Sequence, residues 1–198
     1  ALAVLASGVD GYSHLQHPVA WLGAEPFPNV AGFNLLVFVL PGLLVAWTML
    51  RLRAALPSFG EDPDRPFPRW SARLGAQMAL LSALAFAMQG VLPLDAGDLD
   101  GVRSGRHATA WMAWWIAFAT GAALLAFGLR GIQAWGRLAA TSALVAVLVP
   151  ACALALPQLL PAGLAQRLAF AAWFAWAIHA GIAAHRPVSR NAASATGS

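Results

Sequence analysis

The 198-residue chain is 60% hydrophobic and only 10% charged, with a formal net charge of +4. A soluble globular domain carries about 25% charged residues, so the composition excludes an ordinary water-soluble protein. All 12 basic residues are arginines scattered between apolar runs, without the basic stripe that nucleic-acid binding needs. The composition therefore predicts a membrane protein that contacts lipid and has no nucleic-acid partner.

The apolar runs, taken in chain order, predict about six transmembrane helices. The opening run ends near Val9, which predicts an incomplete or processed first helix. Five runs of about the 20 residues that a membrane helix needs follow, at about 31–50, 74–94, 108–129, 138–156 and 164–184. No alternating segments typical of a β-barrel occur. We expect an all-α, polytopic helix bundle over 1–185 as one domain, followed by a polar cytoplasmic tail over 186–198.

The second apolar run contains a proline-glycine step, Pro41-Gly42, near its middle. Proline lacks the N–H that would bond one turn back, and its ring displaces the carbonyl there. Membrane helices tolerate such a residue, because neighbouring groups satisfy the freed carbonyl. We therefore expect a kink in this helix.

The distribution of arginines between the runs predicts the orientation. If the 51–73 loop is cytoplasmic, the cytoplasmic side holds nine arginines and the other side holds three. Cytoplasmic loops carry an excess of Arg and Lys, so both chain ends are expected in the cytoplasm of a bacterial cell, with the protein in the inner membrane. The nine are Arg51, Arg53, Arg65, Arg69, Arg73, Arg130, Arg137, Arg186 and Arg190, and the three are Arg103, Arg106 and Arg167.

With this orientation, three of the five histidines and five of the eight acids face the outside. Zinc accepts His and Asp ligands, and a catalytic site keeps one position open for water. This face therefore offers a candidate divalent-metal site of His14, His17, Asp95 and His107. The spacing matches no helical zinc-protease motif. The alternative is that these histidines hydrogen-bond within an ordered outer loop or lie at the wet interface.

Three aspartates follow the third run, at Asp95, Asp98 and Asp100. They lack the terminal bidentate acid of a calcium loop. We expect a solvated loop in which they pair locally with Arg103 and Arg106.

His179 lies inside the last apolar run, four residues after Ala175. A titratable group at that depth is a functional candidate, and the small residue leaves room for a flat macrocycle. His179 is therefore a candidate ligand of a haem or chlorophyll-type pigment. The alternative is a neutral histidine that hydrogen-bonds to a neighbouring helix.

Short motifs along most of the chain resemble a known membrane family. Leu22-Gly23, Asn34, Gly42, and the Gly90, Pro93 and Asp95 turn stand at places typical of the bacterial and archaeal family catalogued as domain of unknown function 998. Where that family often has a serine before the leucine-glycine step, this chain has Ala20 and Trp21. The resemblance implies a six-helix bundle and implies no activity.

The sequence contains no serine-histidine-acid set, glycine-rich phosphate loop or nucleotide fingerprint, and no catalytic residue can be named from it. This favours a non-catalytic membrane protein: a structural or accessory subunit, or a lipid- or cofactor-binding bundle, with the bilayer and other membrane subunits as partners. One alternative is a metal-dependent hydrolase at the outer face. Another is a pigment- or haem-binding or transport protein that uses His179.

Overall fold

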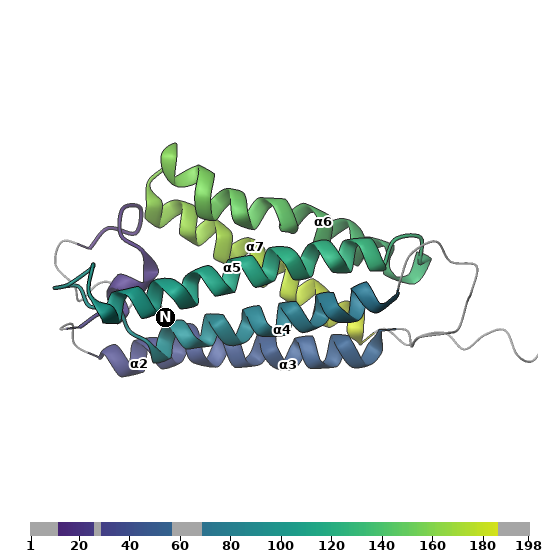
Figure 1. The fold of residues 1–198 in the computed structure, drawn as a ribbon, viewed down its shortest axis with the longest axis horizontal. Coiled ribbons are helices and arrows are strands. Elements are labelled where there is room, and N and C mark those ends of the chain that lie inside the picture. Colours follow the sequence, from purple (N-terminus) through teal and green to yellow (C-terminus); the bar gives the residue numbers. More distant parts are fainter. Residues whose placement is uncertain (1–11, 26–28, 57–68, 186–198) are drawn as a thin grey trace, which may run out of the picture.

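The computed structural model describes residues 12–25, 29–56 and 69–185, and this part of the chain is an all-α bundle (Figure 1). Five of its helices are long and apolar enough to cross a membrane, and the helical fold confirms the predicted all-α class. They are Val30–Ala55, Trp70–Val91, Val102–Gly128, Gln133–Gln158 and Ala162–Ala184. The predicted first helix and the tail lie outside the described residues.

Several spans combine α-helix with short π or 3-10 turns. The α-helices are α2 (Val30–Asn34), α3 (Leu40–Ala55), α4 (Arg69–Val91), α5 (Val102–Gly128), α6 (Gly136–Pro150) and α7 (Ala162–Ala184). The π turns are η2 (Leu35–Val39) and η4 (Ala151–Ala155), and the 3-10 turns are η1 (Val19–Gly23), η3 (Gln133–Trp135) and η5 (Leu156–Gln158). A π turn lies just before Pro41, where the carbonyl of Val37 lacks its usual donor. The kink expected at Pro41 stays a prediction.

The long helices form a ring in which each packs against the next, and α7 closes the ring against α3. Buried aromatic side chains fill its middle. Phe86 lies at the centre, with its ring 4.7 Å from that of Trp173 and 5.1 Å from that of Phe170. The other members of this aromatic core are Phe38, Trp114, Phe118 and Trp176. The interior of the described bundle is thus a packed core.

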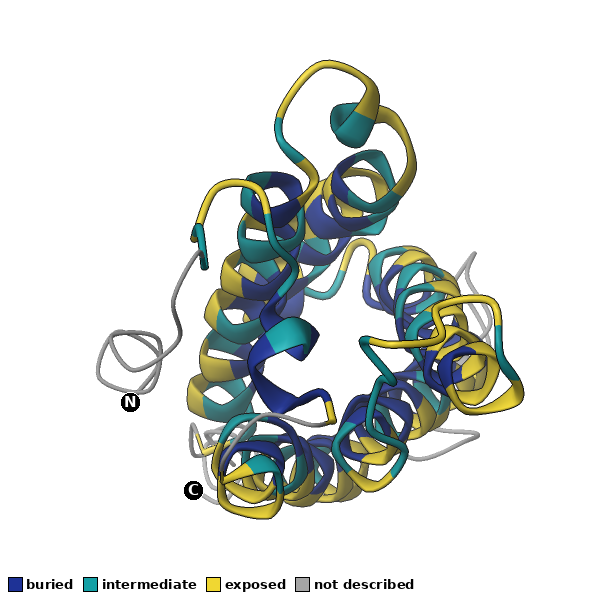
Figure 2. Ribbon diagram, turned by 90° about the vertical axis from the view of Figure 1, so that its left-hand side faces the viewer, coloured by how far each residue is buried: buried dark blue, intermediate teal, exposed yellow. Residues whose placement is uncertain are grey.

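Large apolar side chains also cover much of the outer surface. Figure 2, which views the bundle from one end, shows buried residues towards its middle and exposed residues along the outer sides of the helices. Leu44, Leu144 and Ile178 are 60%, 64% and 65% exposed on three different helices. Soluble monomers rarely expose so much contiguous apolar surface. This surface fits direct contact with lipid.

Helices α4 and α5 approach each other closely where two glycines face each other. A Cβ atom added to Gly121 would lie 2.8 Å from the carbonyl oxygen of Gly75, and one added to Gly75 would lie 2.7 Å from the carbonyl oxygen of Gly121. Small residues let membrane helices pack backbone against backbone. This crossing therefore depends on both glycines.

Residues 12–25 and 92–101 form a unit at one end of the bundle, which we call the cap (Figure 1, left). Its two segments are joined because the N–H of Glu25 donates to the carbonyl of Leu94, and the N–H of Ala96 donates to the carbonyl of Glu25. The buried Asn34 amide fastens the cap to the first span by donating to the carbonyl of Gly23 over 2.8 Å. The polar residues predicted to share one face are thus gathered at one end of the bundle.

Candidate functional site at the cap

The first segment of the cap lies directly on the first turns of α7. The N–H of Leu164 donates to the carbonyl of Leu15 over 3.0 Å, and the N–H of Val19 donates to the side-chain oxygen of Gln166 over 2.7 Å. The approach requires glycine at position 163, where a Cβ atom would lie 2.5 Å from the carbonyl oxygen of His17. Two hydrogen bonds and the close contact at Gly163 thus hold residues 15–19 against the start of α7.

A stack of three rings organises this segment. The ring of His17 lies between those of Tyr12 and Trp21, at centroid distances of 5.6 Å and 5.5 Å and with interplanar angles of 25° and 23°. The N–H of Ser13 donates to Nδ1 of His17 over 3.0 Å. A neutral His17 therefore carries its proton on Nε2. The ring of His14 meets Tyr12 edge-on at 5.1 Å and is itself exposed.

Arg167 on α7 is the centre of this arrangement. Its guanidinium donates to the carbonyls of His17 and Gly163 over 3.0 Å and 2.7 Å, and to the hydroxyl of Tyr12 over 2.6 Å. It also lies 3.5 Å from Nδ1 of His14. None of these four partners is a carboxylate. Within the described ranges, no carboxylate pairs with Arg167.

The four predicted metal ligands are divided between different partners. His14 and His17 lie together around Tyr12, whereas Asp95 and His107 bond elsewhere. Among the residues with described positions, no group of three or more His, Cys, Asp or Glu side chains could hold a metal ion. The structure therefore does not assemble the set His14, His17, Asp95 and His107 into one centre.

The side chain of His107, on α5, caps the C-terminal end of α4. Its Nδ1 lies 2.9 Å from the carbonyl oxygen of Leu92 and 3.2 Å from that of Gln89, and its ring is 7% exposed. The last carbonyls of a helix have no donor within the helix. Because carbonyls only accept, Nδ1 of His107 carries the proton. This contact matches the alternative in which the histidine is bonded within the structure.

We expect His107→Ala to lower the free energy of unfolding by about 1–3 kcal/mol, because two poorly solvated carbonyls lose their donor. Thermal unfolding in detergent measures the effect. His107→Gln is the matched control, since its amide N–H can still donate and should restore part of the loss. Equal stability of His107→Ala and the unsubstituted chain would contradict this capping role.

The loop after α4 is held mainly through the backbone. The Ser104 hydroxyl donates to the carbonyl of Asp98 over 2.7 Å, and the carboxylate of Asp95 accepts from the N–H of Gly97 over 3.0 Å. Arg103 forms its ion pair with Glu25, across the cap. The expected pairing of Arg103 with the loop aspartates is thus corrected, because the parallel bridge between Glu25 and Asp95 brings Glu25 alongside the loop.

His179 lies between α6 and α7. Its Nδ1 is 3.1 Å from the hydroxyl of Thr141, and one turn earlier the indole N–H of Trp176 donates to the Ser142 hydroxyl over 2.9 Å. Two polar contacts therefore join these helices. The geometry agrees with the interpretation of His179 as a residue bonded to a neighbouring helix, and its role as a pigment ligand stays a prediction.

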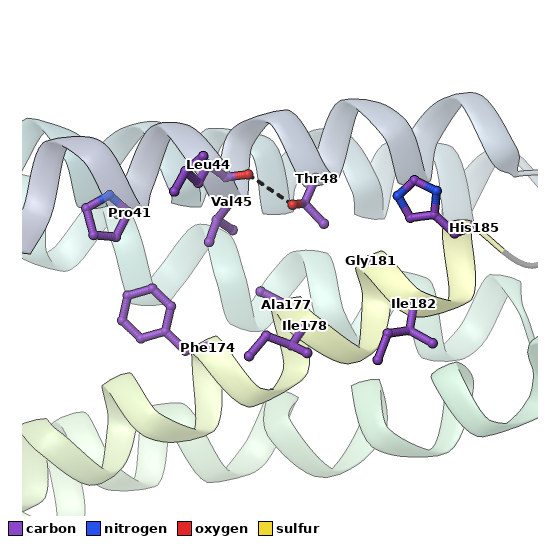
Figure 3. A pocket seen from close by; sticks show the side chains of 10 residues that line it. All are labelled: Pro41, Leu44, Val45, Thr48, Phe174, Ala177, Ile178, Gly181, Ile182 and His185. Carbon is purple, nitrogen blue, oxygen red and sulfur yellow. Dashed lines mark hydrogen bonds between the residues drawn. The ribbon is translucent and has the colours of Figure 1, made fainter.

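A groove of about 590 Å³ runs between α3 and α7, towards the end opposite the cap (Figure 3). Its walls are mostly aliphatic, and its polar side chains are Thr48 and His185. The Thr48 hydroxyl already donates to the carbonyl of Leu44 in its own helix. The groove thus presents a surface suited to lipid chains, with little polar chemistry beyond His185.

Comparison with known protein families, curated proteins and solved structures finds no match to this chain. The resemblance to the six-helix family stays a prediction. In the sequence, Arg167 served only to assign orientation, and its contacts with the cap were not predicted. A signal was present, since Arg167 falls within an apolar run, where a charged residue is a functional candidate.

Proposed function

We propose that this protein is a multi-pass membrane protein that binds membrane lipid at its cap and acts as an accessory or structural component. The arginine distribution supports a cap on the outer side of a bacterial inner membrane, with both chain ends in the cytoplasm. Residues before Tyr12 would contribute the sixth helix, as the resemblance to the six-helix family also implies. Other membrane subunits would contact the exposed apolar faces.

The observation that carries this proposal is the contrast between the core and the cap. Aromatic side chains such as Phe86 and Trp173 occupy the middle of the ring, where a transporter would need a binding site near the bilayer midplane. At the cap, Tyr12 and His14 instead contact Arg167 of α7, and the neighbouring Leu15 is exposed. Polar groups that border apolar surface suit a ligand with a polar head and apolar tails.

Extraction of the full chain in native nanodiscs, followed by exchange into detergent, tests this function. We expect phospholipid to remain bound at about one molecule per chain after extended washing, as quantified by mass spectrometry. Elemental analysis and absorption spectra of the same sample test the other candidates. A stoichiometric metal lost in His14→Ala, or a pigment lost in His179→Ala, would contradict the proposal, as would the complete loss of lipid.

A further inference from the structure

We propose that Arg167 binds the phosphate of an anionic phospholipid, in a site completed by Tyr12 and His14. This inference rests on the proposed lipid-binding function and names the class of lipid. The site lies where the cap meets α7, and its side chains come from segments more than 150 residues apart in the chain. The folded cap is therefore needed to form it.

The charge of Arg167 is the first argument. A guanidinium stays charged in proteins, and taking a charge out of water is costly unless an opposite charge accompanies it. Arg167 is half-buried, and its acceptors are a phenol, an imidazole and two backbone carbonyls. The Glu25 carboxylate of the cap is paired with Arg103. An anionic ligand would supply the opposite charge in a charge-assisted hydrogen bond.

The donors around Arg167 are the second argument. Because the Tyr12 oxygen accepts from Arg167, its own O–H is left to donate. Because Nδ1 of His14 faces the guanidinium, a neutral His14 carries its proton on Nε2, on an exposed ring. The four contacts of Arg167 use its two terminal nitrogens and leave its Nε–H to donate. A guanidinium N–H, a phenol O–H and an imidazole N–H thus lie beside one another. Phosphate oxygens accept several such bonds at once.

The neighbourhood of Arg167 favours a phosphate that carries acyl chains. Leu168, the next residue on α7, is 43% exposed, and Leu15 on the cap is 54% exposed. Arg167 lies five residues into α7, about 8 Å along the helix axis from Ala162. Its bond to the carbonyl of Gly163, one turn earlier, shows that the side chain extends towards the cap. This is the snorkelling geometry of an arginine at a membrane interface.

Binding of phosphatidylglycerol, phosphatidylcholine and inorganic phosphate to the purified full chain tests the proposal, with native mass spectrometry as the readout. We expect phosphatidylglycerol to bind at least about tenfold more tightly than phosphatidylcholine, as a charged hydrogen bond allows. Arg167→Gln should abolish this preference. Arg106→Gln is the matched control, because it removes an exposed arginine from the same end of the bundle and leaves the ion pair of Glu25 with Arg103 intact.

The outcomes separate this inference from the proposed function. Equal retention of both lipids would overturn the assignment to an anionic phospholipid and leave lipid binding standing, whereas retention of neither would overturn both. Full displacement of phosphatidylglycerol by equimolar inorganic phosphate would show a site for a free anion and would overturn the lipid assignment.

Two further variants keep the test independent of folding. Arg167→Lys keeps the charge and should keep part of the preference, whereas the exposed His14→Gln should weaken it without changing thermal stability.

Asp10, two residues before Tyr12 in sequence, lies outside the described residues. If the unsubstituted chain shows no preference and Asp10→Asn creates one, Asp10 neutralises Arg167 and the proposal is wrong.

Discussion

Gly121→Val is expected to lower the free energy of unfolding by about 3 kcal/mol, the upper part of the usual range for overpacking. The added Cβ would lie 2.8 Å from both the carbonyl oxygen of Gly75 and the backbone nitrogen of Ala79. Backbone atoms of a helix cannot rotate away as a flexible side chain can. The two helices must therefore separate, which disturbs the aromatic core that α4 and α5 share through Phe86 and Trp114.

The single cysteine of the chain provides the measurement. Cys152 is 2% exposed, so a thiol reagent reaches it only when the bundle opens. A loss of about 3 kcal/mol corresponds to labelling about a hundredfold faster. Gly105→Val is the matched control, since it lies in the same helix and its added Cβ would meet no atom within 4 Å. Similar labelling rates in the two variants would show that the α4–α5 crossing does not limit stability.

The spans could be predicted from the sequence because hydropathy and length decide them locally. The run expected at about 164–184 is found as Ala162–Ala184, and the one at about 31–50 extends to Val30–Ala55. The inter-helix contacts could not be predicted in the same way. Small residues are so common in every span that their spacing did not single out Gly75 and Gly121, and only the packed structure pairs them.

The candidate site was predictable only as a location. The loop positions place His14, His17, Asp95 and His107 at the same end of the bundle, and the hydrogen bonds around the cap agree with this. The side of the membrane that the arginine count indicates stays a prediction. Their hydrogen-bond partners could not be inferred, because they depend on where other elements end. The acceptors of His107 are carbonyls left free where α4 stops, 15 and 18 residues away.

Gly163→Val is expected to displace the cap from α7 while the membrane helices stay folded. The added Cβ would lie 2.5 Å from the carbonyl oxygen of His17 and 2.7 Å from that of Leu15, both backbone atoms. Overpacking costs about 1–3 kcal/mol, and here it weakens the few contacts between α7 and residues 15–19. Hydrogen exchange of the peptide covering 12–25 should therefore become faster, with Cys152 labelling little changed.

The same variant tests whether lipid binding needs the assembled cap. Arg167 keeps its place on α7 in Gly163→Val, but Tyr12 and His14 move away from it, so the preference for phosphatidylglycerol should fall several-fold. Gly136→Val is the matched control. Gly136 is the first residue of α6, just as Gly163 lies in the first turn of α7, but a Cβ atom added to Gly136 would meet nothing within 4 Å. If hydrogen exchange shows a displaced cap in Gly163→Val but the preference for phosphatidylglycerol is unchanged, Arg167 binds the lipid alone. Tyr12 and His14 would then stabilise the fold and would not belong to the site.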